Sequence, residues 1–229
     1  AAQRRAFGFE VHVNASSAGP GAGNGVFIAG QVPPGSLVLF YPGVSIDAAD
    51  MLLLPGGTRA FDGNEYLMAR YDRTIIDASP RALKVLPPDA IGCPLSVAQM
   101  VNHPPEGKLP SVVPAAIDWG IDMGLHEDLV PLLPNVSYQH SASAQKLLAA
   151  GSGGEPIERN LLDHFRASLA EGVRPPEPEE GPILKGLGFI TTRVLHDEEL
   201  FLNYRFNPRN GYPKWYTPVD QEEDTRRWA

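Results

Sequence analysis

Cysteine is almost missing from this sequence: Cys93 is the single one among 229 residues. An internal disulfide needs two cysteines, and a structural zinc site of the common kind needs several cysteines close together. The composition therefore excludes a disulfide framework and a multi-cysteine zinc site within this chain. Because chains without disulfides are typical of reducing compartments, we expect an intracellular protein, with nucleus and cytoplasm both open.

Long apolar runs and positive charge are also scarce. No stretch approaches the roughly 20 apolar residues of a membrane-spanning helix, so we expect no membrane insertion. Lys and Arg number 19 against 27 Asp and Glu, which gives a net charge of -8. Direct nucleic-acid binding depends on neutralising phosphates and is not expected here. An acidic surface suits a basic partner such as a lysine-containing protein or peptide, although acidity also serves solubility alone.

Glycine and proline, by contrast, are abundant at 23 residues each and are spread along the chain. This distribution favours short strands joined by turns over long helices. We expect a mainly β (α+β) fold that forms one domain over residues 1–229. Proline-punctuated residues 104–133 and residues 141–182 are predicted as insertions, the second carrying a helix over residues 155–171. Residues 207–229 are predicted as an aromatic and acidic tail.

Several short runs are rich in apolar, β-branched and aromatic residues and are bounded by Gly, Pro, Asn or Asp, the pattern typical of strands. The predicted strands are residues 7–13, 25–29, 37–41, 64–70, 74–78 and 135–140, and residues 47–54 are predicted as one or two helical turns.

The stretch Gly188–Phe206 reads as two strands that flank a polar break at His196–Glu199. The first strand ends at Leu195, and the second alternates from Leu200 onward with a period of two. Consecutive side chains on a tight turn point in different directions. We therefore predict that His196–Glu199 is a solvated acidic turn and not a metal site.

Six segments match, in order, the motifs of a known family. They are Gly23-Asn-Gly-Val-Phe27, Pro33-Pro-Gly35 with Leu37–Tyr41, Thr74–Ala78, Met100-Val-Asn-His103, Pro134-Asn-Val136 and Asp197–Tyr204. In this order the chain resembles the SET domain of protein lysine methyltransferases. The resemblance extends from Gly23 to Tyr204 and covers most of the sequence.

The resemblance implies a fold, a cofactor and a set of site residues. The fold would be a SET-like β-clip in which the closing segment threads under the loop that carries Asn102 and His103, a pseudo-knot. The cofactor would be S-adenosyl-L-methionine, bound by Gly23, Asn24, Gly25, Asn102 and His103. The substrate channel for a lysine would include Tyr66, Leu202 and Trp215. The resemblance makes Glu199 a structural residue.

Tyr204 is the predicted catalytic residue. Methyl transfer to an amine is an in-line displacement, and alignment of the reacting groups contributes roughly 7–11 kcal/mol in favourable cases. A lysine amine must first lose a proton from an ordinary pKa of about 10.4. A phenolic hydroxyl both donates and accepts hydrogen bonds, so that Tyr204 is able to orient the amine.

The sequence departs from the family after His103, where Pro104-Pro105 stands in place of Ser-Cys. No cysteine-rich segment follows Tyr204, and residues 212–216 are expected to cover the channel instead. Two alternatives stay open: a catalytically inactive SET-derived module that binds proteins, and a β-rich scaffold whose motif matches are coincidental. Substrate protein, number of methyl groups and oligomeric state are also open.

Overall fold

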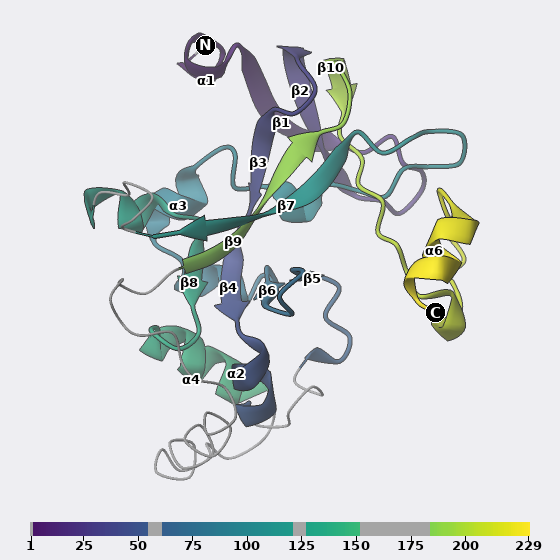
Figure 1. Ribbon diagram of the computed structural model, residues 1–229. Coiled ribbons are helices and arrows are strands. Elements are labelled where there is room, and N and C mark those ends of the chain that lie inside the picture. Colours follow the sequence, from purple (N-terminus) through teal and green to yellow (C-terminus); the bar gives the residue numbers. More distant parts are fainter. Residues whose placement is uncertain (1, 55–60, 121–126, 152–183) are drawn as a thin grey trace. The chain divides into compact units, whose positions relative to one another are not determined.

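The computed structural model describes residues 2–54, 61–120, 127–151 and 184–229 (Figure 1). Within these ranges the chain is an α+β fold of short strands and few helices, which confirms the expected class. The strands are β1 (Phe9–Ala15), β2 (Asn24–Val32), β3 (Leu37–Tyr41), β4 (Gly43–Ile46), β5 (Leu67–Ala69), β6 (Ile75–Asp77), β7 (Val112–Trp119), β8 (Asn135–Ser137), β9 (Leu184–Thr191) and β10 (Leu195–Glu199). The helices are α1 (Ala2–Phe7), α2 (Ala48–Leu53), α3 (Pro88–Gly92), α4 (Ala142–Gly151) and α6 (Gln221–Arg227), with 3-10 turns η2 (Ala82–Val85), η3 (Ala98–Met100), η5 (Glu127–Leu132) and η6 (Pro208–Asn210).

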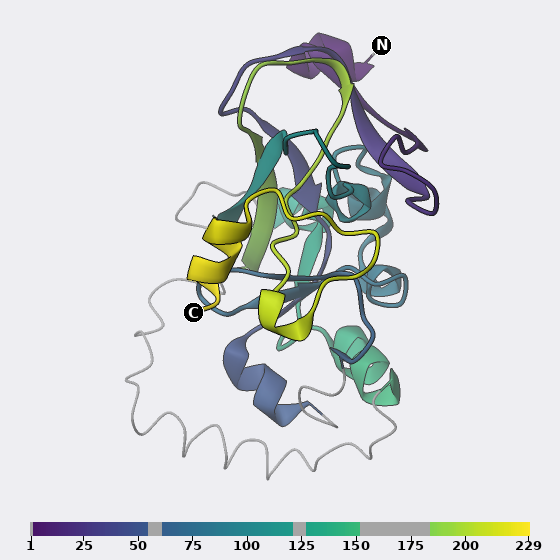
Figure 2. The same cartoon turned by 90° about the vertical axis from the view of Figure 1, so that its right-hand side faces the viewer.

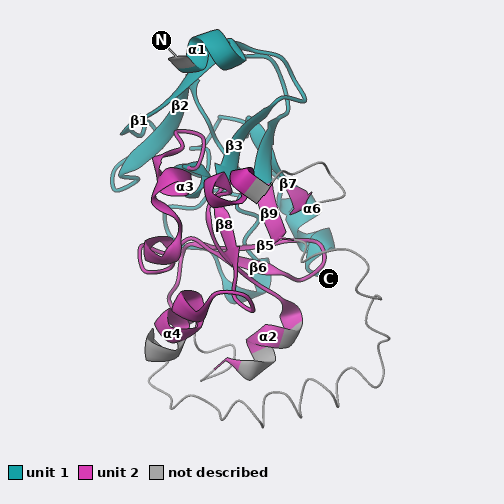
Figure 3. Cartoon of the chain, turned by 90° about the vertical axis from the view of Figure 1, so that its left-hand side faces the viewer, with its two compact units in different colours: residues 1–40, 97–115, 188–229 teal, residues 41–96, 116–187 magenta. Residues whose placement is uncertain are grey.

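The chain divides into two compact units (Figure 3). Unit 1 contains residues 1–40, 97–115 and 188–229, and unit 2 contains residues 41–96 and 116–187. Each unit is therefore assembled from segments that are distant in the sequence. The predicted helix over residues 155–171 lies outside the described residues. The single-domain organisation and the two insertions stay predictions, although the first predicted insertion contains strand β7.

Unit 1 contains a sheet in which β2 is the central strand, with β1 on one side and β10 on the other (Figure 1). Both pairings are antiparallel, and Val11 of β1 lies opposite Ile28 of β2. Alternate β2 side chains such as Val26 and Ile28 are almost completely buried, as expected of a strand with one face on the core. The register shifts between His196 and Glu198 of β10, which marks a β-bulge.

A second sheet has the strand order β3-β9-β7. Its residues in unit 1 include Val38, Leu39, Val112 and Phe189, none of which is exposed to solvent. Burial of such apolar side chains contributes about 1.5–3 kcal/mol each, so these residues stabilise unit 1.

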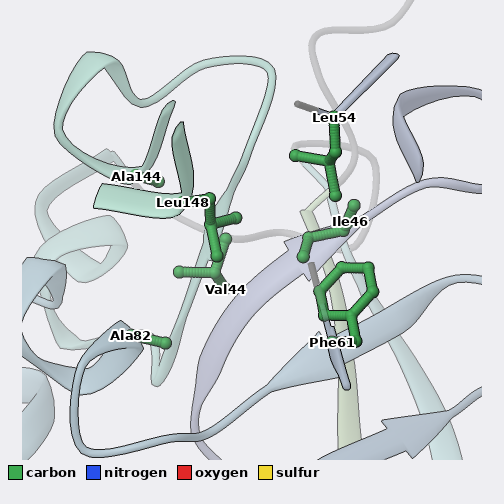
Figure 4. Close-up of a cluster of buried hydrophobic side chains, with 7 residues drawn as sticks. All are labelled: Val44, Ile46, Leu54, Phe61, Ala82, Ala144 and Leu148. Carbon is green, nitrogen blue, oxygen red and sulfur yellow. The ribbon is translucent and has the colours of Figure 1, made fainter. Parts of the chain in front are cut away.

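Unit 2 is built on the sheet β5-β6-β4-β8, in which β4 runs antiparallel to β6 and parallel to β8. A cluster of buried side chains includes two residues of β4 (Figure 4). Its members are Val44, Ile46, Leu54, Phe61, Ala82, Ala144 and Leu148. Gly43 begins β4 with a φ of 140°, and a Cβ at this position would collide with the Asp77 carbonyl of β6.

The acidic turn predicted at His196–Glu199 is wrong, because these residues form β10. The turn lies earlier, at Thr192–Val194. Asp197 adopts a φ of 45° at the bulge, and its Oδ1 accepts a hydrogen bond from the Gly30 N–H at 2.7 Å. The polar residues are thus accommodated within the strand by pairing with β2. After Glu199 the predicted second strand is reduced to isolated bridges at Phe201 and Leu202.

Candidate active site

The segment that follows β10 lies between the two ends of a single loop of unit 1. The Leu202 N–H donates to the Asn102 carbonyl at 2.9 Å, and the Ser111 N–H donates to the Phe201 carbonyl at 2.8 Å. Parallel bridges join Asn102 to Phe201 and Val112 to Leu202. The closing segment therefore has hydrogen bonds on both edges, one from each end of the loop over residues 102–112. Figure 2 shows the chain continuing from there to the yellow helix α6.

Tyr204 stands just beyond this point and contacts the loop with two groups. Its backbone N–H donates to Nδ1 of His103 at 3.3 Å, and its hydroxyl donates to the Val101 carbonyl at 3.1 Å. Because a carbonyl accepts but cannot donate, the phenolic proton is committed to Val101. Toward any further group the Tyr204 oxygen is therefore an acceptor. The side chain is 37% exposed, so that part of the ring is open to solvent.

His103 is buried and is held at both ring nitrogens. Nε2 lies 2.8 Å from the Thr217 carbonyl and must donate to it, while Nδ1 accepts the Tyr204 N–H. This pair of contacts fixes one neutral tautomer. Burial lowers the pKa of His103, which is opposed by its backbone contacts and by the charge of Asp224. Any contact of His103 with a ligand would use its backbone, since its imidazole is engaged within the protein.

The amide of Asn102 connects the loop to the start of β2. Its Nδ2 donates to the Asn24 carbonyl at 2.9 Å. Next to Asn24, Gly23 has a φ of 65°, and a Cβ there would meet no atom within 4 Å. The backbone at Gly23 is thus open to a ligand, as a cofactor loop requires. Gly25 differs, because a Cβ at Gly25 would overlap the carboxylate of Glu199.

Two of the predicted channel residues, Leu202 and Trp215, lie in unit 1. Leu202 is buried at 4% exposure, whereas Trp215 is 61% exposed. The Trp215 and Tyr204 rings meet edge to face, with centroids 6.2 Å apart. Tyr66 belongs to unit 2, so that its part in the channel stays a prediction. The site described here therefore contains Leu202, Trp215 and Tyr204, together with the cofactor-loop residues.

Four further residues form a cluster that reaches Tyr204 through Phe206, whose ring centroid lies 5.9 Å from that of Tyr204. Phe206 and Tyr212 pack on Tyr216, with ring centroids 4.9 and 5.0 Å apart. The Tyr216 hydroxyl lies 3.5 Å from Oδ2 of Asp224. Burial raises the pKa of Tyr216 to about 12 and also raises the pKa of Asp224. The aromatic run over residues 212–216 was visible in the sequence, but nothing there distinguished Asp224 from its neighbouring acids.

Three features of this arrangement are compatible with the cofactor that the resemblance implies. Gly23 has an approachable backbone, Asn24 is exposed, and Asn102 joins this strand end to the loop that borders Tyr204. Backbone and amide groups of this kind suit a ligand with several hydrogen-bonding groups. Comparison with known protein families finds no match, and no curated protein matches the sequence. Among the described residues, no helix has the length and apolar character needed to cross a membrane.

Proposed function

We propose that this chain is a SET-like methyltransferase that transfers a methyl group from S-adenosyl-L-methionine to a lysine of a protein substrate. One observation carries the proposal: Asn24, Asn102 and Tyr204, from three distant segments, converge in unit 1. Asn102 contacts the Asn24 carbonyl through its side chain and the Leu202 N–H through its carbonyl. The closing segment held between two ends of one loop also supports the proposed pseudo-knot and SET-like β-clip.

The chemistry follows from the state of the Tyr204 hydroxyl. The bound cofactor would supply a methyl group on a positively charged sulfur. Because the Tyr204 proton is donated to Val101, its oxygen presents lone pairs to the reacting groups. A lone pair attracts an ammonium N–H and the polarised hydrogens of a methyl group. Tyr204 would thus orient the amine after deprotonation and hold it in line for displacement.

Exposed aromatic rings and the negative net charge favour a lysine-containing, basic peptide as the substrate. Trp215 and Tyr204 present exposed aromatic surface, which attracts a cation such as a lysine ammonium. The net charge of -8 favours the approach of a basic peptide. Leu202 of the closing segment is buried and offers no hydroxyl, so that hydrogen bonding to the amine near this point depends on Tyr204.

Calorimetric titration of S-adenosylmethionine, and of its demethylated product, tests the cofactor site. We expect micromolar binding to the unmodified chain, equivalent to about -8 kcal/mol. Asn102→Ala should weaken binding by tenfold or more, because it releases the Asn24 carbonyl. Asn210→Ala in the exposed turn η6 is the matched control and should leave binding unchanged. No binding to the unmodified chain would overturn the proposed function.

A second candidate function is a protein-binding module without catalysis. The observation that favours it is that both ring nitrogens of His103 are engaged within the protein, so that this imidazole has no free nitrogen to act as a general base. Such a module would bind lysine-containing peptides in the absence of cofactor. Peptide binding that survives Tyr204→Phe, combined with no cofactor binding, would favour the module over the enzyme.

A further inference from the structure

We propose that Glu199 is a positioning residue that fixes the loop over residues 16–24, whose backbone forms part of the proposed cofactor site. This inference rests on the proposed function only for its effect on the cofactor. The effect on the loop itself does not depend on the proposed function.

The carboxylate of Glu199 accepts three hydrogen bonds from two consecutive serines. The Ser16 hydroxyl donates to Oε1 at 2.5 Å. The Ser17 N–H and hydroxyl donate to Oε2 at 2.7 and 2.6 Å. Glu199 is only 5% exposed, so these bonds are largely shielded from competing water. Hydrogen bonds to a charged acceptor are about twice as strong as neutral ones, which makes this the strongest attachment described for the loop.

The loop needs an external attachment because it has little packing of its own. Residues 16–23 read Ser-Ser-Ala-Gly-Pro-Gly-Ala-Gly and contain no large apolar side chain. Within the loop, backbone bonds join the Ser16 N–H to the Gly23 carbonyl at 2.9 Å and the Ala22 N–H to the Gly19 carbonyl at 3.2 Å. Glycine-rich segments lose more conformational entropy than others when they are ordered. Glu199 offsets part of that cost.

The identity of residue 25 supports the same role for Glu199. A Cβ at Gly25 would overlap Oε1 of Glu199 and would lie 3.3 Å from the Ser16 Cβ. Gly25 has no positive φ, so its backbone conformation does not demand glycine. The space that Gly25 leaves is taken by the Glu199 carboxylate, which explains why a larger residue does not fit.

The loop is thereby fixed at both ends. Glu199 holds Ser16 and Ser17 at the first end, and Asn102 holds the Asn24 carbonyl at the second. Neither contact needs a ligand to be present. Loss of the Glu199 contacts should therefore reduce cofactor affinity indirectly, because a mobile loop must be ordered when the ligand binds.

Glu199→Gln tests this role, and Glu198→Gln is its matched control. Glu198 is the neighbouring residue of β10, but its carboxylate accepts from the Arg193 guanidinium at 2.7 and 2.5 Å and not from the loop. The first measurement is amide hydrogen exchange of residues 16–24 without cofactor, at a temperature where each variant is folded. We expect about tenfold faster exchange at the Ser17 amide in Glu199→Gln and no change in Glu198→Gln.

The second measurement is the dissociation constant of S-adenosylmethionine in the same variants. We expect it to rise about tenfold in Glu199→Gln and to stay unchanged in Glu198→Gln. A residue that only stabilised the fold would lower the melting temperature and leave the affinity of the folded chain unchanged.

Ser16→Ala provides a milder variant that keeps the β10 carboxylate. If Glu199 acts through the serines, the effects of Ser16→Ala and Glu199→Gln on affinity should be less than additive when combined. Unchanged exchange and unchanged affinity in both single variants would overturn the proposal. If the unmodified chain binds no cofactor but Glu199→Gln speeds loop exchange, the positioning role stands and the proposed function falls.

Discussion

The backbone N–H of Tyr204 donates to Nδ1 of His103, a residue 101 positions earlier in the chain. The same imidazole donates through Nε2 to the carbonyl of Thr217. One buried ring thus joins the loop that follows η3, the closing segment and the C-terminal segment of unit 1. Residues 207–229, which the sequence suggested to be a tail, therefore include a direct partner of the candidate site.

Replacement of His103 by Phe should lower the free energy of unfolding by about 2–4 kcal/mol. The change leaves the Thr217 carbonyl and the Tyr204 N–H without their partner, and an unpaired buried group costs about 1–3 kcal/mol. Urea denaturation measures the loss. His140→Phe, at an exposed position, should change stability by no more than about 0.5 kcal/mol. Equal losses in the two variants would contradict the structural role of His103.

The stability of the chain should fall in mild acid in part because of His103. Burial lowers the pKa of His103 below its ordinary value of 6.5. In the unfolded chain the imidazole takes up a proton near pH 6.5, whereas in the folded chain it resists protonation. The unfolded state therefore binds more protons as the pH falls below 6.5, and the free energy of unfolding decreases. Urea midpoints from pH 8 to pH 5 should decline more steeply for the unmodified chain than for His103→Gln. Parallel curves would rule out this contribution.

Arg70→Met should destabilise unit 2 by about 3 kcal/mol. The side chain of Arg70 has no exposed surface, and its guanidinium donates to the Gly186 carbonyl and to Oδ1 of Asp118, both at 2.6 Å. Removal of the cation takes this donor from the buried Gly186 carbonyl and breaks the ion pair with Asp118. Arg73→Met, at a nearby exposed position, should cost no more than about 0.5 kcal/mol. Thermal and urea unfolding of the two variants would show the difference, and a negligible loss for Arg70→Met would refute it.

Gly43→Ala should cost at least about 2 kcal/mol, and Gly92→Ala should be neutral or slightly stabilising. Gly43 combines a φ of 140° with a Cβ position that the Asp77 carbonyl occupies. Gly92 ends α3 without a positive φ, and its Cβ would meet no atom within 4 Å. Circular dichroism melts of the two variants provide the comparison. An unchanged melting temperature of Gly43→Ala would contradict this prediction, because it would mean that β4 moves away from the Asp77 carbonyl at no cost in stability.

Local sequence patterns predicted the strands that begin and end at turn residues of the sequence. The apolar run Leu37–Tyr41 lies between turn residues, and it became β3 with the same bounds. The break before β10 was misplaced because the polar run His196–Glu199 resembles a turn, while its strand conformation depends on pairing with β2. A β-bulge interrupts the alternation of buried and exposed side chains, so that a strand with a bulge cannot be recognised from that alternation.

In the candidate site, only the residues that lie in family-like motifs could be predicted from the sequence. The resemblance pointed to Asn102 and Tyr204, which the structure places on adjoining segments of unit 1. The contact of His103 with Thr217 and the contacts of Glu199 with Ser16 and Ser17 were not predicted. Each joins residues more than a hundred positions apart, and their register depends on how whole strands pair. The tertiary fold, and not the local pattern, decides such contacts.

The pairing of β2 with β10 has a consequence for synthesis in the cell. Gly30 and Asp197 are hydrogen-bonded but lie 167 residues apart, so that β2 emerges from the ribosome long before β10. At ordinary translation rates the interval is roughly 10–30 s. During that time one edge of the β1-β2 hairpin lacks its native strand and is open to pairing with other chains. Unit 1 should therefore depend on chaperones, or on rapid translation of the segment up to β10, more than its small sheets alone would suggest.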